Sequence, residues 1–264
     1  MAGTEHLIFE RRGPVAIVIM NRPEARNALS LPMLVGMADA WEEIDGDDDI
    51  RCAVLTGAGG TFCSGMDLKS MSGPDAERYQ HRTQADPDLH WKALLRHYQL
   101  RKPLVAAVEG YAVAGGTEIL QATDIRVAGR SAKFGVFEAR RGLFPLGGST
   151  VRLRRQIPFT SAMDLLLTGR EVSAEEALRI GLIGRVVADG SALDEALAIA
   201  EAVSANGPLA VEAIKRSVRE TEGISEHEAL EIELEIGMPI FATEDAAEGQ
   251  RAFSEKRPPQ YHRK

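Results

Sequence analysis

The chain has 264 residues, of which 44% are hydrophobic and 27% are charged. This composition is typical of a globular protein and excludes a disordered or collagen-like chain. The formal net charge of −8 argues against a nucleic-acid-binding surface over the whole molecule. Two cysteines and six scattered histidines have neither disulfide-framework nor metal-ligand spacing, so we expect no metal site.

The N-terminal residues carry charges where a signal peptide would place its apolar stretch. The first apolar run, residues 15–20, is far shorter than the roughly 20 residues that cross a bilayer. We therefore expect a cytoplasmic protein that binds neither membrane nor nucleic acid.

Strand and helix signals alternate from the start of the chain. Residues 14–20 follow an Arg-Gly-Pro turn and predict a strand. Ser30 can cap a helix that has Pro32 in its first turn. The acidic run 45–49 is interpreted as a solvated loop, and the apolar run 50–56 after it predicts a buried strand.

The middle of the chain begins with an irregular stretch. Residues 71–102 are polar and contain two prolines, so we expect a loop and a poorly ordered helix there. Beyond it we expect strands at 104–108 and 125–128, a helix from 115 to about 122, and amphipathic helices at 191–204, 208–221 and 225–236. Alternation followed by helices predicts an α/β core with a helical C-terminal part.

A glycine-rich segment, residues 56–68, follows the second buried strand. A dinucleotide-binding fingerprint would need glycine at 62, where Phe62 stands, and a phosphate-binding P-loop would need lysine at 66, where Met66 stands. Cys63 and Ser64 lack a nearby histidine and a nucleophile-elbow motif, so a structural role is the favoured interpretation for both.

A second glycine-rich turn, residues 110–118, also follows a buried strand. Such turns expose backbone N–H groups, and two of them meeting at one point would form an oxyanion hole. Glu118 lies one helical turn beyond Gly115, and Glu138 lies beside a further turn rich in glycine and proline. Glu138 could form a surface ion pair with its neighbouring arginines, or the two glutamates could act together as acid and base.

These segments resemble the crotonase superfamily of enoyl-CoA hydratases and isomerases, and in particular actinobacterial hydratases. The matching segments are 21–29, 55–68, 102–110, 114–118, 124–126, 134–135, 138–145 (spaced E-x3-G-x2-P), 167–170, 174–182 and 251–257. The resemblance implies an α/β fold with a crotonase-like ββα spiral core, residues 1–195, that binds acyl-CoA. Residues 196–264 would form a C-terminal helical trimerisation region.

By the same resemblance, the backbone N–H groups of Met66 and Gly115 would hold the thioester carbonyl of an acyl-CoA. The residue matching Glu118 helps to activate water, and the one matching Glu138 transfers the proton to C2. Retention of both carboxylates favours a hydratase over an isomerase or a non-catalytic acyl-CoA-binding homologue. Two positions depart from the family pattern, because Ala114 replaces a frequent glycine and Phe137 a frequent proline.

The resemblance also assigns the remaining contacts to CoA. They are Arg26, Ala28, Ser64, Asp67 and Leu68, together with Phe253 and Lys256 of the C-terminal segment, which often acts across a subunit boundary. A frayed, charged C-terminus is the alternative for that segment. The implied assembly is a homotrimer or a dimer of trimers, without a separate cofactor because CoA is part of the substrate. Residues 71–102 would shape a roomy acyl site for a medium, long or polycyclic enoyl group.

Overall fold

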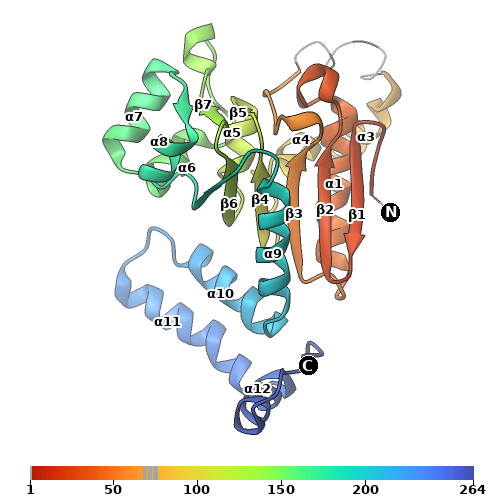
Figure 1. Ribbon diagram of the computed structural model, residues 1–264, viewed down its shortest axis with the longest axis vertical. Helices are drawn as coiled ribbons and strands as arrows, with labels where there is room; N and C mark the ends of the chain where they lie inside the picture. The colour runs from red at the N-terminus through yellow and green to blue at the C-terminus, as the bar shows by residue number, and fades with distance from the viewer. Residues whose placement is uncertain (1, 68–69, 71–72, 74–76) are drawn as a thin grey trace.

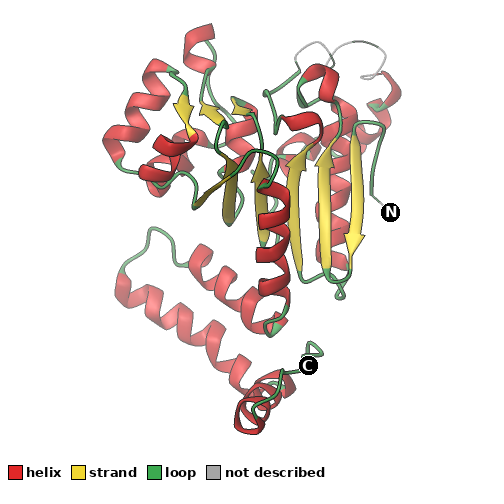
Figure 2. Cartoon of the chain, in the orientation of Figure 1, coloured by secondary structure: helices red, strands yellow, loops and turns green. Residues whose placement is uncertain are grey.

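A six-stranded sheet forms the centre of the computed structural model, which describes residues 2–67, 70, 73 and 77–264 (Figures 1 and 2). In spatial order its strands are β1 (Leu7–Arg12), β2 (Val15–Met20), β3 (Cys52–Gly57), β4 (Leu104–Val108), β6 (Ile125–Gly129) and β9 (Arg185–Val187). Strand β1 is antiparallel to β2, with Leu7 opposite Met20, and all other neighbours are parallel.

Helices cover both faces of this sheet. In β2, Val15 and Ile17 pack in the cluster that contains α9 (Ala192–Ser204), while Ala16 and Val18 pack in the cluster of α1 (Leu31–Gly46). Successive side chains of a strand point to opposite faces. A strand buried on both faces therefore reads as a continuous apolar run, which is why β2 to β4 were recognisable from the sequence.

A small three-stranded sheet lies beside the large one. It consists of β5 (Tyr111–Val113), β7 (Lys133–Gly135) and β8 (Val172–Ser173). Helix α5 (Gly115–Leu120) begins just after β5, and a bridge between Cys63 and Ala112 attaches the first glycine-rich turn to the same sheet. The small sheet thus brings the two glycine-rich turns together.

Short helices complete the core and a separate helical layer ends the chain. The core helices are η1 (Pro23–Ala25), η2 (Ala58–Gly60), α3 (Gln80–Ala85), α4 (Leu89–Ala93), η3 (Glu138–Arg141), α6 (Ser149–Gln156), α7 (Phe159–Thr168) and α8 (Ala174–Arg179). The layer consists of α10 (Pro208–Glu220), α11 (Glu226–Gly237), η4 (Met238–Ala242) and α12 (Glu244–Glu255), drawn in blue at the foot of Figure 1. The boundary predicted at 195/196 falls inside α9, which packs against the sheet, and stays a prediction.

The strands and helices expected from the sequence are present to within about two residues. The acidic run 45–49 differs from the expected solvated loop at its first residue, whereas residues 47–49 lie beyond α1 and are partly or fully exposed. Asp45 lies in the last turn of α1 and is buried. Its carboxylate accepts hydrogen bonds from the Tyr98 hydroxyl (3.0 Å) and the Arg101 backbone N–H (3.0 Å), which offset the cost of burying it. Strands β1 and β9, the small sheet and helices α6, α7, α8 and α12 were not predicted from the sequence.

No single helix of the described residues is long and apolar enough to cross a membrane. Helices α9 and α10, which meet at an angle of 107°, reach the length and apolar composition of a membrane span only when they are taken together. No group of three or more His, Cys, Asp or Glu side chains in residues 2–67, 70, 73 and 77–264 could hold a metal ion.

Candidate active site

Backbone hydrogen bonds join residues 22–29, which follow β2, to the turn that follows β3. The Ser64 N–H donates to the Arg26 carbonyl (3.1 Å), and the Leu29 N–H donates to the Gly65 carbonyl (2.8 Å). The Asp67 N–H donates to the Leu29 carbonyl (3.1 Å). This pairing fixes the direction in which the intervening Met66 N–H points.

Asn27 holds this loop pair together and was not among the predicted site residues. Its side chain is 0% exposed and donates to the carbonyls of Ala58 (2.9 Å) and Thr61 (2.6 Å). It also accepts from the Arg22 N–H (2.8 Å), and its backbone has a positive φ of 52°. Asparagine is among the few residue types that tolerate this conformation.

The second glycine-rich turn meets the first at Gly115. A Cβ atom placed on Gly65 would lie 3.3 Å from the Gly115 nitrogen, and one placed on Gly115 would lie 3.5 Å from the Met66 nitrogen. Ala114, which precedes the helix, has φ 50° and ψ −126°. Within the described part of the chain, no hydrogen bond uses the N–H of Met66 or of Gly115. Two unpaired donors therefore lie side by side, an arrangement suited to an oxyanion.

Glu118 lies on the first turn of α5 and is 5% exposed. Its carboxylate accepts a hydrogen bond from the Ser149 N–H (3.2 Å) and contacts the Gly147 backbone so closely that a Cβ there would lie 2.6 Å from Oε2. Burial raises the pKa of Glu118, and backbone N–H groups of residues 147–149 partly oppose that effect. Donors to a carboxylate favour its ionised form.

Glu138 begins the short helix η3 and has a different environment. Its Oε2 atom is buried and has no hydrogen-bond partner among the described residues. Burial, together with the negative charge of Glu118, raises the pKa of Glu138 to about 7. A carboxyl group that has one oxygen without a donor and a raised pKa is suited to carry a proton at neutral pH.

The structure brings most of the predicted site residues together. Arg26, Ala28, Ser64, Met66, Asp67 and Gly115 belong to the two joined turns, whereas Leu68 lies outside the described residues. Phe253 and Lys256 belong to the end of α12, at the opposite end of the molecule from the turns that follow β2 and β3 (Figure 1). Phe253 is 87% exposed. One chain alone does not place these two residues beside the turns.

Further side chains around the site were missed from the sequence. Arg22 forms an ion pair with Asp67, which fixes the Asp67 carboxylate against the first loop. Ser149 supports Glu118, and its hydroxyl accepts from the Gln121 amide (2.8 Å). The Gly147–Gly148 pair after Pro145 was the available sequence signal for the Ser149 turn, but its contact with Glu118 depends on the tertiary fold.

Comparison with known proteins agrees with this geometry. The family model described as enoyl-CoA hydratase/isomerase matches residues 10–264. The chain belongs to this family. The resemblance to the crotonase superfamily inferred from the sequence is thereby confirmed.

Individual members of the family cover nearly the whole chain. The enoyl-CoA hydratase EchA19 of Mycobacterium tuberculosis is 58% identical over 255 residues, which is 96% of this chain and 95% of that protein. The (E)-benzylidenesuccinyl-CoA hydratase of Thauera aromatica is 41% identical over 249 residues, or 94% and 95% of the two chains. A crystal structure of an enoyl-CoA hydratase from M. tuberculosis H37Rv superposes with a TM-score of 0.89 at 40% identity, covering 99% and 100%.

Proposed function

We propose that this protein is an enoyl-CoA hydratase that adds water across the 2,3-double bond of a trans-2-enoyl-CoA. The observation that carries the proposal is the pair of unlike carboxyl groups, Glu118 and Glu138, on the elements that adjoin two unpaired backbone N–H groups. Two family members, 58% and 41% identical to this chain, are named hydratases, which supports the same reaction.

The chemistry follows from the environments of the groups. The thioester oxygen would accept hydrogen bonds from Met66 N–H and Gly115 N–H, which stabilise the enolate-like charge as it develops. Ionised Glu118 would take a proton from water while the water oxygen bonds to C3. Protonated Glu138 would give its proton to C2. One water is consumed, and the product is a 3-hydroxyacyl-CoA.

We further propose that CoA lies along the joined turns, near Arg26, Ala28, Ser64, Asp67 and Leu68. Phe253 and Lys256 would come from a neighbouring copy of the chain. Their position at the opposite end of the molecule from the joined turns supports this. The apolar groove between α10, α11 and η4, of about 400 Å³, supports assembly as a homotrimer or a dimer of trimers through the helical layer. No separate cofactor is needed for this reaction.

The acyl group is proposed to be medium, long or polycyclic, as in the oxidation of fatty acids or sterol side chains. Support comes from the length of residues 71–102, the segment that shapes the acyl site in the family this chain resembles. The proposal requires that kcat/KM does not fall steadily from the four-carbon substrate to larger ones.

The decisive experiment follows the loss of enoyl-thioester absorbance over a panel of trans-2-enoyl-CoAs. Glu118→Gln and Glu138→Gln are each expected to lower kcat by about 10²- to 10⁴-fold, because each removes one acid–base group. Glu175→Gln, at an exposed position on α8, serves as the control and is expected to match the unaltered protein.

Other outcomes point to other activities of the fold. Conversion of a 3-enoyl-CoA in heavy water without addition of water would identify an isomerase. Binding of CoA without turnover of any enoyl-CoA would identify a non-catalytic acyl-CoA-binding protein. Either result, with the panel unreactive, would overturn the hydratase proposal.

A further inference from the structure

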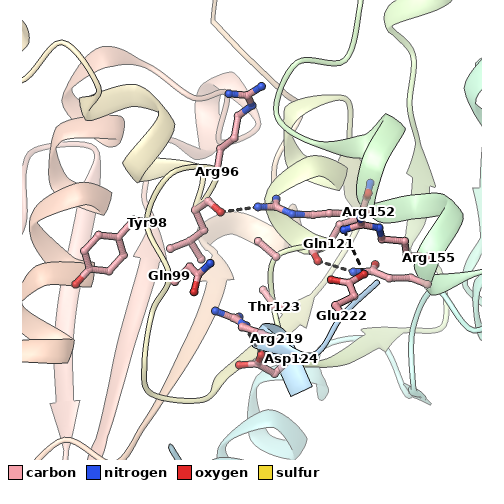
Figure 3. Close-up of a pocket in the computed structure, with 13 residues that line it drawn as sticks. Arg96, Tyr98, Gln99, Gln121, Thr123, Asp124, Arg152, Arg155, Arg219 and Glu222 are labelled. Atoms are coloured by element: carbon pink, nitrogen blue, oxygen red, sulfur yellow. Dashed lines mark hydrogen bonds and ion pairs between the residues drawn. The ribbon is translucent and has the colours of Figure 1, made fainter. Parts of the chain in front are cut away.

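A polar cavity of about 280 Å³ lies at the end of α5 away from Gly115 (Figure 3). Its walls come from the segment after α4, the segment between α5 and β6, helix α6, and the end of α10. Asp124 at its floor donates its backbone N–H to the Leu104 carbonyl, where β4 begins. The turns proposed for CoA follow the opposite ends of β2 and β3, so the cavity is separate from them.

Arginine dominates the charge of this cavity. Four guanidinium groups, from Arg96, Arg152, Arg155 and Arg219, line it with two carboxylates, from Asp124 and Glu222. Asp124 is already bound by Arg219 (3.2 Å) and by Lys215 (2.6 Å). Glu222 pairs with Arg155 at 3.3 Å. The carboxylates therefore leave a surplus of positive charge.

That surplus is concentrated on Arg152 and Arg96. Arg152 donates to the carbonyl oxygens of Gly147 and Leu95, and Arg96 contacts His97 and stacks over the Trp91 ring at 4.7 Å. Across residues 77–264 and the described positions before them, neither guanidinium has a carboxylate partner. Burial, and then repulsion from Arg219, lower the pKa of Arg152, while attraction to Glu118 and Glu222 opposes part of this effect.

A buried acceptor without a partner lines the same cavity. Gln121 is 2% exposed, and its Oε1 atom has no hydrogen-bond partner among the described residues. Its amide nitrogen is already used by the Ser149 hydroxyl. Buried polar atoms are nearly always hydrogen-bonded, so a free one indicates a missing donor.

We propose that this cavity is a second binding site, for the phosphoryl group of a small phosphate or phosphate monoester. Guanidinium groups bind phosphate oxygens through paired hydrogen bonds. The site goes beyond the proposed hydratase reaction and does not depend on it.

Isothermal titration calorimetry with inorganic phosphate tests this site directly, at constant ionic strength maintained with sodium chloride. Arg155 and Arg154 provide a matched pair, because they are neighbours on α6 and only Arg155 lines the cavity. We expect saturable 1:1 binding that Arg155→Gln and Arg96→Gln each weaken at least 10-fold, while Arg154→Gln leaves it unchanged. Gln121→Glu, which places a carboxylate in the cavity, is expected to abolish binding.

A second titration with glycerol 3-phosphate distinguishes the source of the phosphoryl group. Tighter binding than inorganic phosphate supports a phosphate monoester, and weaker binding supports the free anion. Absence of saturable binding by the folded, unaltered protein to both probes would overturn the proposal, as would equal weakening by Arg154→Gln and Arg155→Gln. These titrations involve no enoyl-CoA, so their failure is distinguishable from failure of the hydratase proposal.

Discussion

Glu118 and Glu138 have the same side chain but different surroundings. Backbone N–H groups of residues 147–149 stabilise the Glu118 carboxylate, whereas Glu138 Oε2 is buried without a donor. The environment therefore favours a proton on Glu138 and a charge on Glu118. A carboxyl group kept protonated at neutral pH in this way costs folding free energy once the pH forces it to ionise.

The pKa of Glu138 predicts a specific pH dependence of stability. Its pKa rises from an ordinary 4.5 to about 7 on folding, so the folded state holds a proton that the unfolded state has lost. Stability from this group is complete below about pH 4.5 and is lost as the pH rises through 7. Glu138→Gln is therefore expected to be more stable than the unaltered protein by about 1–2 kcal/mol at pH 8, after allowance for solvent screening.

Urea denaturation at pH 8 and at pH 4.5 measures this difference. At pH 4.5 both side chains are neutral, so the two proteins are expected to have nearly equal free energies of unfolding. A Glu138→Gln protein that is no more stable at pH 8 than the unaltered one would show that ionisation of Glu138 does not lower the free energy of unfolding.

The residues proposed to take part in the reaction have a stronger sequence signal than the residues that hold them in place. Met66, Gly115, Glu118 and Glu138 belong to motifs whose spacing shows in the sequence. Asn27 and Ser149 were missed because their hydrogen-bond partners are distant carbonyl, amide or carboxyl groups that only the fold brings near. Hydrogen bonds between residues that are distant in the sequence produce no periodic pattern in it.

At the scale of elements, helix α5 and its C-terminal cap place Gly115 and Glu118 of the proposed active site, and Gln121 of the second cavity, within seven residues. The helix can do so because Gly116 lets its first turn pack directly on the Cys63 backbone. A Cβ atom on Gly116 would lie 2.3 Å from the Cys63 carbonyl oxygen. The glycine is thus required by close approach of two backbone segments.

Gly116→Ala is expected to push α5 away from the Cys63 turn, lowering stability by about 1–3 kcal/mol and reducing kcat because the two N–H groups separate. Thermal unfolding and enoyl-CoA turnover measure the two effects. Gly46→Ala, at the end of α1 with no atom within 4 Å of the new methyl group, is the control and should leave kcat unchanged without lowering stability. Normal kcat in Gly116→Ala would contradict the role of this packing.

The elements that the sequence predicted are those with strong local patterns. Long apolar strands buried on both faces and capped amphipathic helices were found. Strands β5, β7 and β8 have two or three residues each, too few for a period to appear. Strand β1 reads as polar because most of its residues are partly or fully exposed at the sheet edge, so only pairing with β2 defines it.

At the scale of the whole molecule, the helical layer leaves an apolar face uncovered. Phe241, on η4, is 74% exposed, and Val218, Leu234 and Met238 beside the same groove are also exposed. A patch of this kind on a folded chain indicates an interface. Phe253 and Lys256 at the end of this layer are far from their own chain's turns, which agrees with a site completed by a second copy (Figure 1).

Phe241→Asp is expected to convert the proposed trimer or hexamer to monomers, because it places a charge in the centre of the groove while costing the separate chain little. Light scattering after size-exclusion chromatography gives the mass directly. Leu167→Asp, at an exposed position on α7 outside the groove, is expected to keep three chains together. A monomeric unaltered protein would refute the proposed assembly.

Ala114 affects both the folding stability of the chain and the rigidity of its turn, and glycine at this position would affect them differently. A non-glycine residue with φ 50° and ψ −126° carries backbone strain of about 1–3 kcal/mol, held in place by the surrounding contacts. The methyl group also removes many of the alternative conformations that glycine would sample at that peptide. The chain therefore exchanges some folding stability for rigidity at the donor next in sequence, so the Gly115 N–H keeps its direction before any ligand arrives.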